Sequence, residues 1–292
     1  MTAPTLQPGE KAKLFPGVSF GDYCRIEAVN ASTFLTMADQ TPKEAYYKIT
    51  HPKDDTDSLV KGHAAHAAIL EPEVFAAQYV ACPNFGDYRS PKNREARDNW
   101  IQENSSKIVI DAEQFQLAQD MRDAVLGQAD TKDLLTNAKG QNELTILFWD
   151  APTGLLCKVR IDRMTQFDGR VLLDVKTAKS TTDRGIQTAI VDYHYHGRMA
   201  WYMDALNLVH QFNDWRVMFL WIKNSPPHVF RISELQEWDL AEGRAMYREC
   251  LDAYANCKKT GNWPGHPAGI TPISLPRWAF TRTPPPPLEM LK

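Results

Sequence analysis

The fold is decided by two stretches that alternate between apolar and polar residues. They are Leu155-Leu156-Cys157-Lys158-Val159-Arg160-Ile161-Asp162 and Val171-Leu172-Leu173-Asp174-Val175-Lys176. A period of two predicts β-strands, each with one buried face. Phe167-Asp168-Gly169-Arg170 between them predicts a turn, because glycine accepts positive φ and aspartate can bond its own backbone. The two stretches therefore predict a β-hairpin.

Acidic and basic side chains gather at one end of this hairpin. If the strands pair, Asp162 and Asp174 lie near one another, and Lys176 follows two residues further along the same face. Two carboxylates and an ammonium group at a strand end predict a site for a hard divalent cation and an activated water. Asp-x-Lys on a strand is common by chance. The alternative to a metal site is therefore an edge strand whose Asp174 and Lys176 are simply solvated. A solvated strand would tolerate Leu172 beside Asp174 poorly.

Composition excludes several classes of protein. The chain has 292 residues, of which 43% are hydrophobic and 24% are charged, as in ordinary globular proteins. A net charge of −3 excludes a polycation that coats nucleic acid indiscriminately, although residues 158–198 carry eight Lys or Arg against five Asp. Five widely spaced cysteines without C-x-x-C exclude a zinc ribbon and an iron–sulfur run. With no apolar run of about 18 residues, we expect a cytoplasmic protein without membrane association.

The order of helix and strand signals predicts the domain organisation. We expect a flexible N-terminal arm over residues 1–22, one domain over 23–278 and a Pro-rich tail over 279–292. Within the domain, residues 23–140 are mainly helical and residues 141–278 form the core. Strands are predicted at 143–150, 155–164, 171–176 and 215–222, with an edge strand at 228–232. This pattern indicates an α/β (α+β) fold with a mixed central sheet flanked by helices.

Helix signals lie on both sides of these strands. Predicted N-caps are Ser32, Thr41 (followed by Pro42), Asp111, Asp183 and a capping box that starts at Ser233. The helix over 58–70 ends before Pro72, and the last helix ends near Gly261. Residues 82–107 predict a long polar loop with a short helix from Asn93, either a lid, a nucleic-acid clamp or plain surface.

His63 and His66 lie three residues apart on the predicted helix over 58–70. The spacing alone favours the interpretation that one histidine packs against the protein and the other is exposed to solvent. A zinc site needs further ligands, and H-x-x-H lacks the glutamate of H-E-x-x-H.

Five motifs in order along the chain resemble the PD-(D/E)xK nuclease superfamily, and more closely its RecE-like (exonuclease VIII) branch, related to the RecB, Cas4 and AddB nuclease domains. The motifs are Gly62-x-x-x-His66, Leu70-Glu71-Pro72, Gly154-Leu155-Leu156-Cys157 running into Asp162, Asp174-Val175-Lys176-Thr177, and Tyr193-x-Tyr195-His196 leading to Ala200-Trp201-Tyr202. The similarity extends from about Tyr23 to Trp278. The resemblance implies a restriction-endonuclease-like core with an N-terminal helical elaboration.

The resemblance also implies roles for individual residues. Asp162, Asp174 and the backbone carbonyl of Val175 would bind Mg²⁺ or Mn²⁺, and His66 would be a ligand or support one. Lys176 would orient or deprotonate the attacking water, and Tyr202 belongs to the motif of the following helix. That motif usually reads Gln-x-x-x-Tyr, whereas this chain has Arg198-x-x-x-Tyr202. Supporting or DNA-binding candidates are Glu143, Arg198, Lys179 and Arg160.

The implied activity is metal-dependent hydrolysis of phosphodiester bonds in linear double-stranded DNA, from 5′ to 3′, by a ring-like homo-oligomer. The implied setting is phage-type homologous recombination, with a RecT-like single-strand annealing protein as partner. The alternatives are a non-catalytic DNA-binding or assembly protein that keeps the nuclease fold, an endonuclease or Cas4-like nuclease, and a zinc enzyme that uses His63 and His66.

Overall fold

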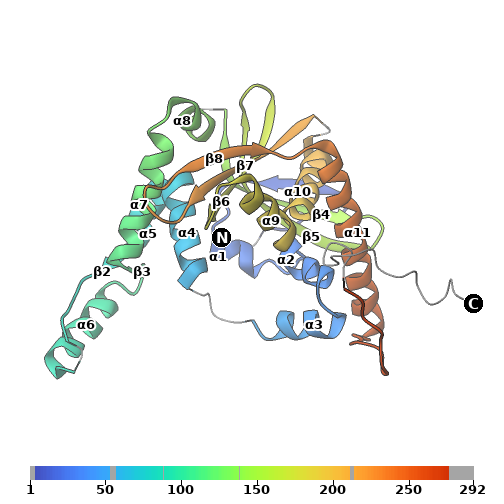
Figure 1. Ribbon diagram of the computed structural model, residues 1–292, viewed down its shortest axis with the longest axis horizontal. Helices are drawn as coiled ribbons and strands as arrows, with labels where there is room; N and C mark the ends of the chain where they lie inside the picture. The colour runs from blue at the N-terminus through green and yellow to red at the C-terminus, as the bar shows by residue number, and fades with distance from the viewer. Residues whose placement is uncertain (1–3, 53–56, 88, 138, 211–213, 276–292) are drawn as a thin grey trace, which may run out of the picture.

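A six-stranded mixed sheet forms the centre of the molecule, in a computed structural model that describes residues 4–52, 57–87, 89–137, 139–210 and 214–275 (Figure 1). Its strand order is β1-β4-β5-β6-β7-β8. The strands are β1 (Ala12–Phe15), β4 (Gln141–Asp150), β5 (Leu155–Gln166), β6 (Arg170–Ala178), β7 (Trp215–Lys223) and β8 (Phe230–Glu234). Among the described strands of this sheet, β6 and β7 pair in parallel and all other neighbours pair antiparallel. The predicted fold class is confirmed, with β7 inside the sheet and β8 at its edge.

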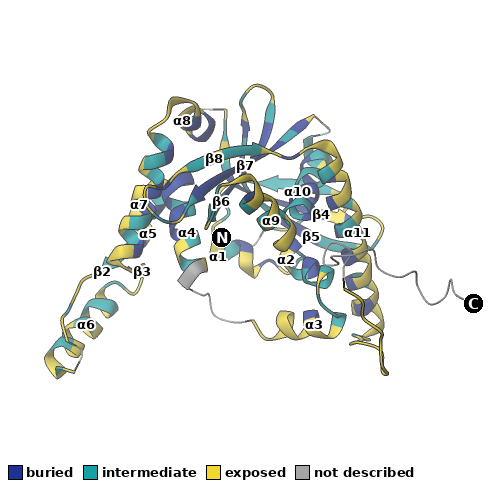
Figure 2. Ribbon diagram, in the orientation of Figure 1, coloured by how far each residue is buried: buried dark blue, intermediate teal, exposed yellow. Residues whose placement is uncertain are grey.

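Two layers of helices cover the sheet, and Figure 2 shows its strands mostly buried between them. One face packs against α2 (Ala31–Phe34), α10 (Tyr195–His210) and α11 (Glu237–Thr260), around residues such as Phe34, Trp201 and Leu251. The other face packs against α4 (Asp57–Leu70), α7 (Ala112–Leu126) and α8 (Ala129–Thr136). The remaining helices are α1 (Phe20–Arg25), η1 (Leu35–Ala38), α3 (Pro42–Thr50), α5 (Pro72–Gln78), α6 (Pro91–Glu103) and α9 (Asp183–Asp192). Both faces of the strands therefore carry apolar residues.

The N-terminal residues join the sheet, so the prediction of a flexible arm is wrong for part of residues 1–22. β1 pairs with β4 in antiparallel register, and α1 begins at Phe20. Sequence periodicity missed β1 because four residues flanked by Pro and Gly carry little signal. The predicted tail over 279–292 lies outside the described residues.

Helix starts were predicted with mixed success. Thr41 and Asp111 each form the predicted cap, in a capping box with the residue three positions later. Asn30 rather than Ser32 caps α2, and Thr182 rather than Asp183 caps α9. Ser233 lies in β8, and Gln236 caps α11 instead. At α2 and α9 several side chains able to cap follow one another, and those of Asn30 and Thr182 accept the hydrogen bond from the first turn. At Ser233 the strand β8 continues to Glu234, so the helix begins later. The end of α11 at Gly261, with φ of 70°, is confirmed.

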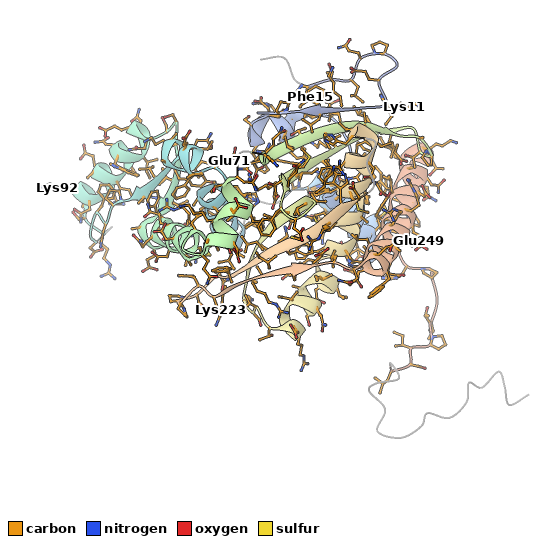
Figure 3. All side chains as sticks on the ribbon, turned by 90° about the horizontal axis from the view of Figure 1, so that it is seen from above. Lys11, Phe15, Glu71, Lys92, Lys223 and Glu249 are labelled. Carbon is orange, nitrogen blue, oxygen red and sulfur yellow. The ribbon has the colours of Figure 1, made fainter. Side chains whose placement is uncertain are left out.

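A second, small sheet lies at the two ends of residues 82–107, which were predicted as a long polar loop with a short helix from Asn93. β2 (Tyr79–Cys82) and β3 (Ile108–Asp111) pair in parallel, and α6 makes the connection between them. None of the residues of α6 is buried. Figure 1 shows α6 extending away from the main sheet, and Figure 3 places Lys92 at the far end of this extension. The predicted helix is therefore present but longer than expected, because α6 lacks the apolar stripe that would have marked its bounds, and the pairing of β2 with β3 was missed.

In the part of the chain that the structure describes, no helix combines the length and apolar character needed to cross a lipid bilayer.

Candidate metal centre

His66 lies between two carboxylates that come from neighbouring strands. Its Nδ1 is 3.0 Å from Glu143 Oε1, and its Nε2 is 2.7 Å from Asp162 Oδ2. One donor atom from each of these three residues lies within 4.8 Å of the other two. His66 is on α4, which packs beside the end of β6, where Gly62 approaches Thr177. Three residues spread over almost a hundred positions of sequence therefore form one cluster, which we call the His66 cluster.

The backbone of β4 bends where it presents Glu143. This residue has φ of 54°, a conformation that few non-glycine residues adopt, and its side chain is mostly buried. On either side of it, Asn142 bonds the carbonyl of Leu70 on the α4 side, whereas Leu144 packs in the core of the opposite face. A regular strand would place these two on the same side. Such unfavourable backbone is typical of functional sites, because only the surrounding structure maintains it.

Strand β5 has a matching irregularity at Asp162. Ile161 and Met164 pack against the same core, although residues three apart in a regular strand point to opposite faces. The β5–β6 ladder covers Arg163 to Gln166 and is not continued at Asp162. Instead, Asp162 Oδ2 accepts a hydrogen bond of 2.8 Å from the backbone N–H of Val175. The two strands thus separate at the site, and the Asp162 carboxylate takes the place of a ladder acceptor.

Asp174 and Lys176 lie beside the cluster on β6 and form an ion pair through Asp174 Oδ2 and Lys176 Nζ. The ammonium nitrogen closely approaches this buried carboxylate oxygen, so the charge of each group is neutralised by the other. Lys176 Nζ also lies 4.9 Å from the ring centroid of Tyr195. Both aspartates and the lysine of the hairpin therefore lie close together, and His66 and Glu143, which the resemblance named as a ligand or its support and as a supporting carboxylate, lie with them.

The charges of the site shift one another's pKa values. Burial lowers the pKa of His66, but the charges and hydrogen bonds of Asp162 and Glu143 outweigh it and raise the pKa to about 10. Burial and the charge of Asp162 raise the pKa of Asp174. Burial lowers the pKa of Lys176, but Asp174 and Asp162 outweigh it and raise that pKa. A proton on His66 therefore supplies, without metal, the positive charge that the two carboxylates require.

The remaining predicted residues lie around this centre. Arg160 donates from Nε to Glu143 Oε2 at 2.5 Å and from Nη1 to the carbonyl of Val18 at 2.7 Å. Arg198 bonds Ser32 at 3.4 Å through Nη2, while its buried Nε has no hydrogen-bond partner. Burial raises the pKa of Tyr202, one helical turn after Arg198. Lys179 is exposed just beyond the end of β6.

Tyr195 and Glu71, which the sequence placed in motifs without a role of their own, lie near the site, and His63, the second histidine of the zinc alternative, lies apart from it. Tyr195 holds its ring against the Lys176 ammonium group. Glu71 follows α4, and burial together with the charge of Glu143 raises its pKa. His63 is outside the His66 cluster and packs its ring 5.6 Å from that of Phe20. The zinc interpretation required both histidines in one site, and this arrangement separates them.

The donor set of the His66 cluster fits a divalent cation. It offers one imidazole nitrogen and carboxylate oxygens from two residues, and Asp174 adds a third carboxylate nearby. Oxygen donors suit Mg²⁺ and Mn²⁺, and an imidazole favours a transition metal such as Mn²⁺. Two hollows of ≈ 310 and ≈ 330 Å³ are lined by none of these residues. The chemistry of the side chains, not cavity size, identifies the site.

Comparisons with known proteins show the family and the fold. The model of a family described as "PDDEXK-like domain of unknown function (DUF3799)" matches residues 31–272. The crystal structure of a "Putative exonuclease" from Eubacterium rectale has a similar fold, with a TM-score of 0.57 over 87% of this chain and 94% of the other, at 13% identity. The structure of SSO0001, at 11% identity over 75% of this chain and 84% of the other, has a TM-score of only 0.27. No curated protein matches the sequence.

Proposed function

This chain belongs to the family of PDDEXK-like domains, and from that premise we propose that it is a metal-dependent nuclease that hydrolyses phosphodiester bonds of DNA. One observation carries the proposal: the His66 cluster adjoins the Asp174–Lys176 pair at the point where β5 and β6 separate. The side chains that can bind a cation therefore lie next to an amine that can contact water.

Each side chain has a task in this proposal. His66, Glu143 and Asp162 hold the cation, with Asp174 and the carbonyl of Val175 as further ligands. When bound, Mg²⁺ or Mn²⁺ lowers the pKa of water and neutralises charge that develops on the phosphate oxygens. Lys176, fixed between Asp174 and the ring of Tyr195, orients the attacking water. A nearby divalent charge lowers the pKa of Lys176, which increases the fraction of neutral amine that is able to take a proton from water.

The proposal is tested by incubating linear and closed circular duplex DNA with the chain in Mg²⁺ or Mn²⁺, and then in EDTA. We expect cleavage with metal only. Lys176→Ala and Asp174→Asn should each lower the rate at least about 100-fold, since each removes a group that acts on water or cation. Matched controls are Lys223→Ala at the end of the neighbouring strand and Asp168→Asn in the β5–β6 turn. Near-normal rates in either site variant would refute the assignment.

The finer proposal is an exonuclease that degrades linear duplex DNA from 5′ to 3′ as a ring-like homo-oligomer, together with a RecT-like annealing protein. It rests on the ordered motifs of the sequence. Release of mononucleotides from linear DNA and no attack on closed circles would support exonuclease action, and strands labelled at one end would give the direction. Sedimentation of the full chain would give the number of subunits. Cutting of closed circles would indicate an endonuclease instead.

A further inference from the structure

Two exposed aromatic rings stand next to the candidate site, at the two ends of a continuous row of contacts. Phe20 on α1 is 55% exposed and Tyr193, at the end of α9, is 62% exposed. Large apolar surface is costly to leave in water, and aromatic rings exposed beside a binding site are candidates for ligand contacts. Figure 1 shows α1, α4 and α9 around the end of β6.

The Phe20 end of the row leads directly to the His66 cluster. The guanidinium carbon of Arg160 lies 5.8 Å from the centroid of the Phe20 ring. The same guanidinium group bonds the carboxylate of Glu143 and the carbonyl of Val18, two residues before Phe20. Arg160 thus ties the start of α1 to a candidate metal ligand and fixes the position of the Phe20 ring.

The Tyr193 end leads to the catalytic lysine. The ring centroid of Tyr193 is 5.5 Å from that of Tyr195, whose ring in turn faces Lys176 Nζ. Between the two tyrosines, His194 adopts φ of 53° and bonds Asp39 through Nε2 at 2.7 Å. This unusual backbone residue is anchored to a separate segment of the chain. The anchor holds the exposed ring of Tyr193 in place before α10 begins.

A base-paired duplex has no free base faces except at its ends, whereas an unpaired strand exposes the face of every base. Proteins that bind single strands combine backbone contacts with aromatic rings on which bases stack, largely independent of sequence. The phosphate would lie at the metal centre, and the rings lie at both ends of the row that contains it. Neither ring is needed to bind a metal or to activate water.

We propose that Phe20 and Tyr193 are stacking sites for nucleobases that flank the cleaved phosphate, so that the strand in the site is unpaired. The inference rests on the proposed function and adds to it the form of the substrate: a single-stranded end, or a duplex end opened by a few base pairs. Enzymes that act inside a duplex must likewise unstack or extrude the nucleotides that they attack.

The test measures binding of a single-stranded oligonucleotide to the full chain carrying Lys176→Ala, which keeps the candidate metal ligands and prevents cleavage. Tyr193→Ala and Phe20→Ala, each added to this background, should weaken binding about 5-fold or more, as expected for the loss of one stacked base. Tyr193→Phe and Phe20→Tyr should bind normally, because each keeps an aromatic ring. Trp149→Ala is the matched control. Trp149 is 47% exposed and lies six residues from Glu143 on β4, hence roughly 20 Å away.

An oligonucleotide with abasic sites throughout separates stacking from phosphate contacts. It should bind the alanine variants and the Lys176→Ala parent equally, because no base remains to stack. The inference is overturned if Tyr193→Ala and Phe20→Ala both bind the normal oligonucleotide as tightly as the Lys176→Ala parent does. It is also overturned if these two changes weaken binding of the abasic oligonucleotide as much as they weaken binding of the normal one. In either case, metal-dependent cleavage by the unmodified chain would still support the proposed function. An unmodified chain that neither binds nor cleaves DNA would overturn both.

Discussion

At the scale of single residues, the raised pKa of His66 bears on the proposed binding of a metal. Its pKa of about 10 lies above the ordinary value of 6.5, because Asp162 and Glu143 outweigh the effect of burial. A group with a raised pKa stabilises the metal-free fold fully below pH 6.5, and this stabilisation is lost as the pH rises through 10. A cation that uses the imidazole must displace its proton.

Metal affinity should therefore increase with pH between about 6.5 and 10. Release of one proton per cation predicts up to about tenfold tighter binding per pH unit. Calorimetric titration of the full chain with Mn²⁺ at pH 7 and pH 8 measures this change. His66→Gln, which cannot be protonated, should bind more weakly and with little pH dependence. Equal slopes in the two proteins would exclude His66 as the group that exchanges its proton for metal.

Arg198 replaces the glutamine expected at its position, and its buried Nε lacks a partner. Buried polar groups without partners are rare, and a phosphate oxygen would satisfy this one. Arg198→Ala should lower kcat/KM about 100-fold, as for other donors to a reacting group. Arg198→Gln should recover part of that loss. Arg231→Ala on the edge strand is the control, and a loss there of similar size would argue for a general effect of charge.

At the scale of elements, the site depends on the contact between α10 and α11, because α10 carries Arg198 and Tyr202. The two helices approach closely at Gly197 and Gly243. A Cβ atom on Gly243 would lie 2.4 Å from the carbonyl oxygen of His196, which is backbone and cannot turn aside. Glycine is therefore required at position 243 by the closeness of the two helices.

Gly243→Ala should push α10 away from α11 and lower the free energy of unfolding by about 2 kcal/mol or more, as overpacking of a core does. Cleavage should decrease as well, since Arg198 moves with its helix. Thermal or denaturant unfolding measures the first effect. Gly21→Ala is the control: an added Cβ there meets nothing within 4 Å, so the variant should be as stable as the parent. Equal stability of both variants would contradict the packing argument.

At the scale of the whole molecule, the tip of the extension made by β2, α6 and β3 lies apart from the His66 cluster, although β2 and β3 pack against α4, which carries His66. α6 buries no residue, and the core beneath it is formed by α4, α5 and α7 together with β2 and β3 (Figure 2). Glu71, near the base of this extension, is far from Lys92 at its tip in Figure 3. We therefore expect that α6 can change without disturbing the sheet.

Replacing residues 84–106 by a flexible Gly/Ser linker of about ten residues, enough to join the two parallel strands, should leave stability and cleavage of short oligonucleotides nearly unchanged. Unfolding midpoint and cleavage rate measure these effects. The same variant on long duplex DNA shows whether α6 contacts the substrate: a loss of affinity confined to long DNA would indicate such contacts. A large drop in stability would mean that α6 supports the fold.

The sequence by itself determined features that depend on neighbouring residues. The β5–β6 hairpin, the caps at Thr41 and Asp111 and the end of α11 follow from periodicity, local hydrogen bonds and glycine at positive φ. The closeness of Asp174 and Lys176 follows from the period of a strand. These local effects have similar energies in any fold, so they can be inferred without coordinates.

Only the tertiary structure decided which distant residues meet. It brought His66 between Glu143 and Asp162, added β1 to the sheet and paired β2 with β3. Joining segments so far apart costs chain entropy that no local pattern encodes, and burial of the two sheet faces supplies the compensating free energy. The bent backbone at Glu143 likewise persists because packing on both sides holds it there.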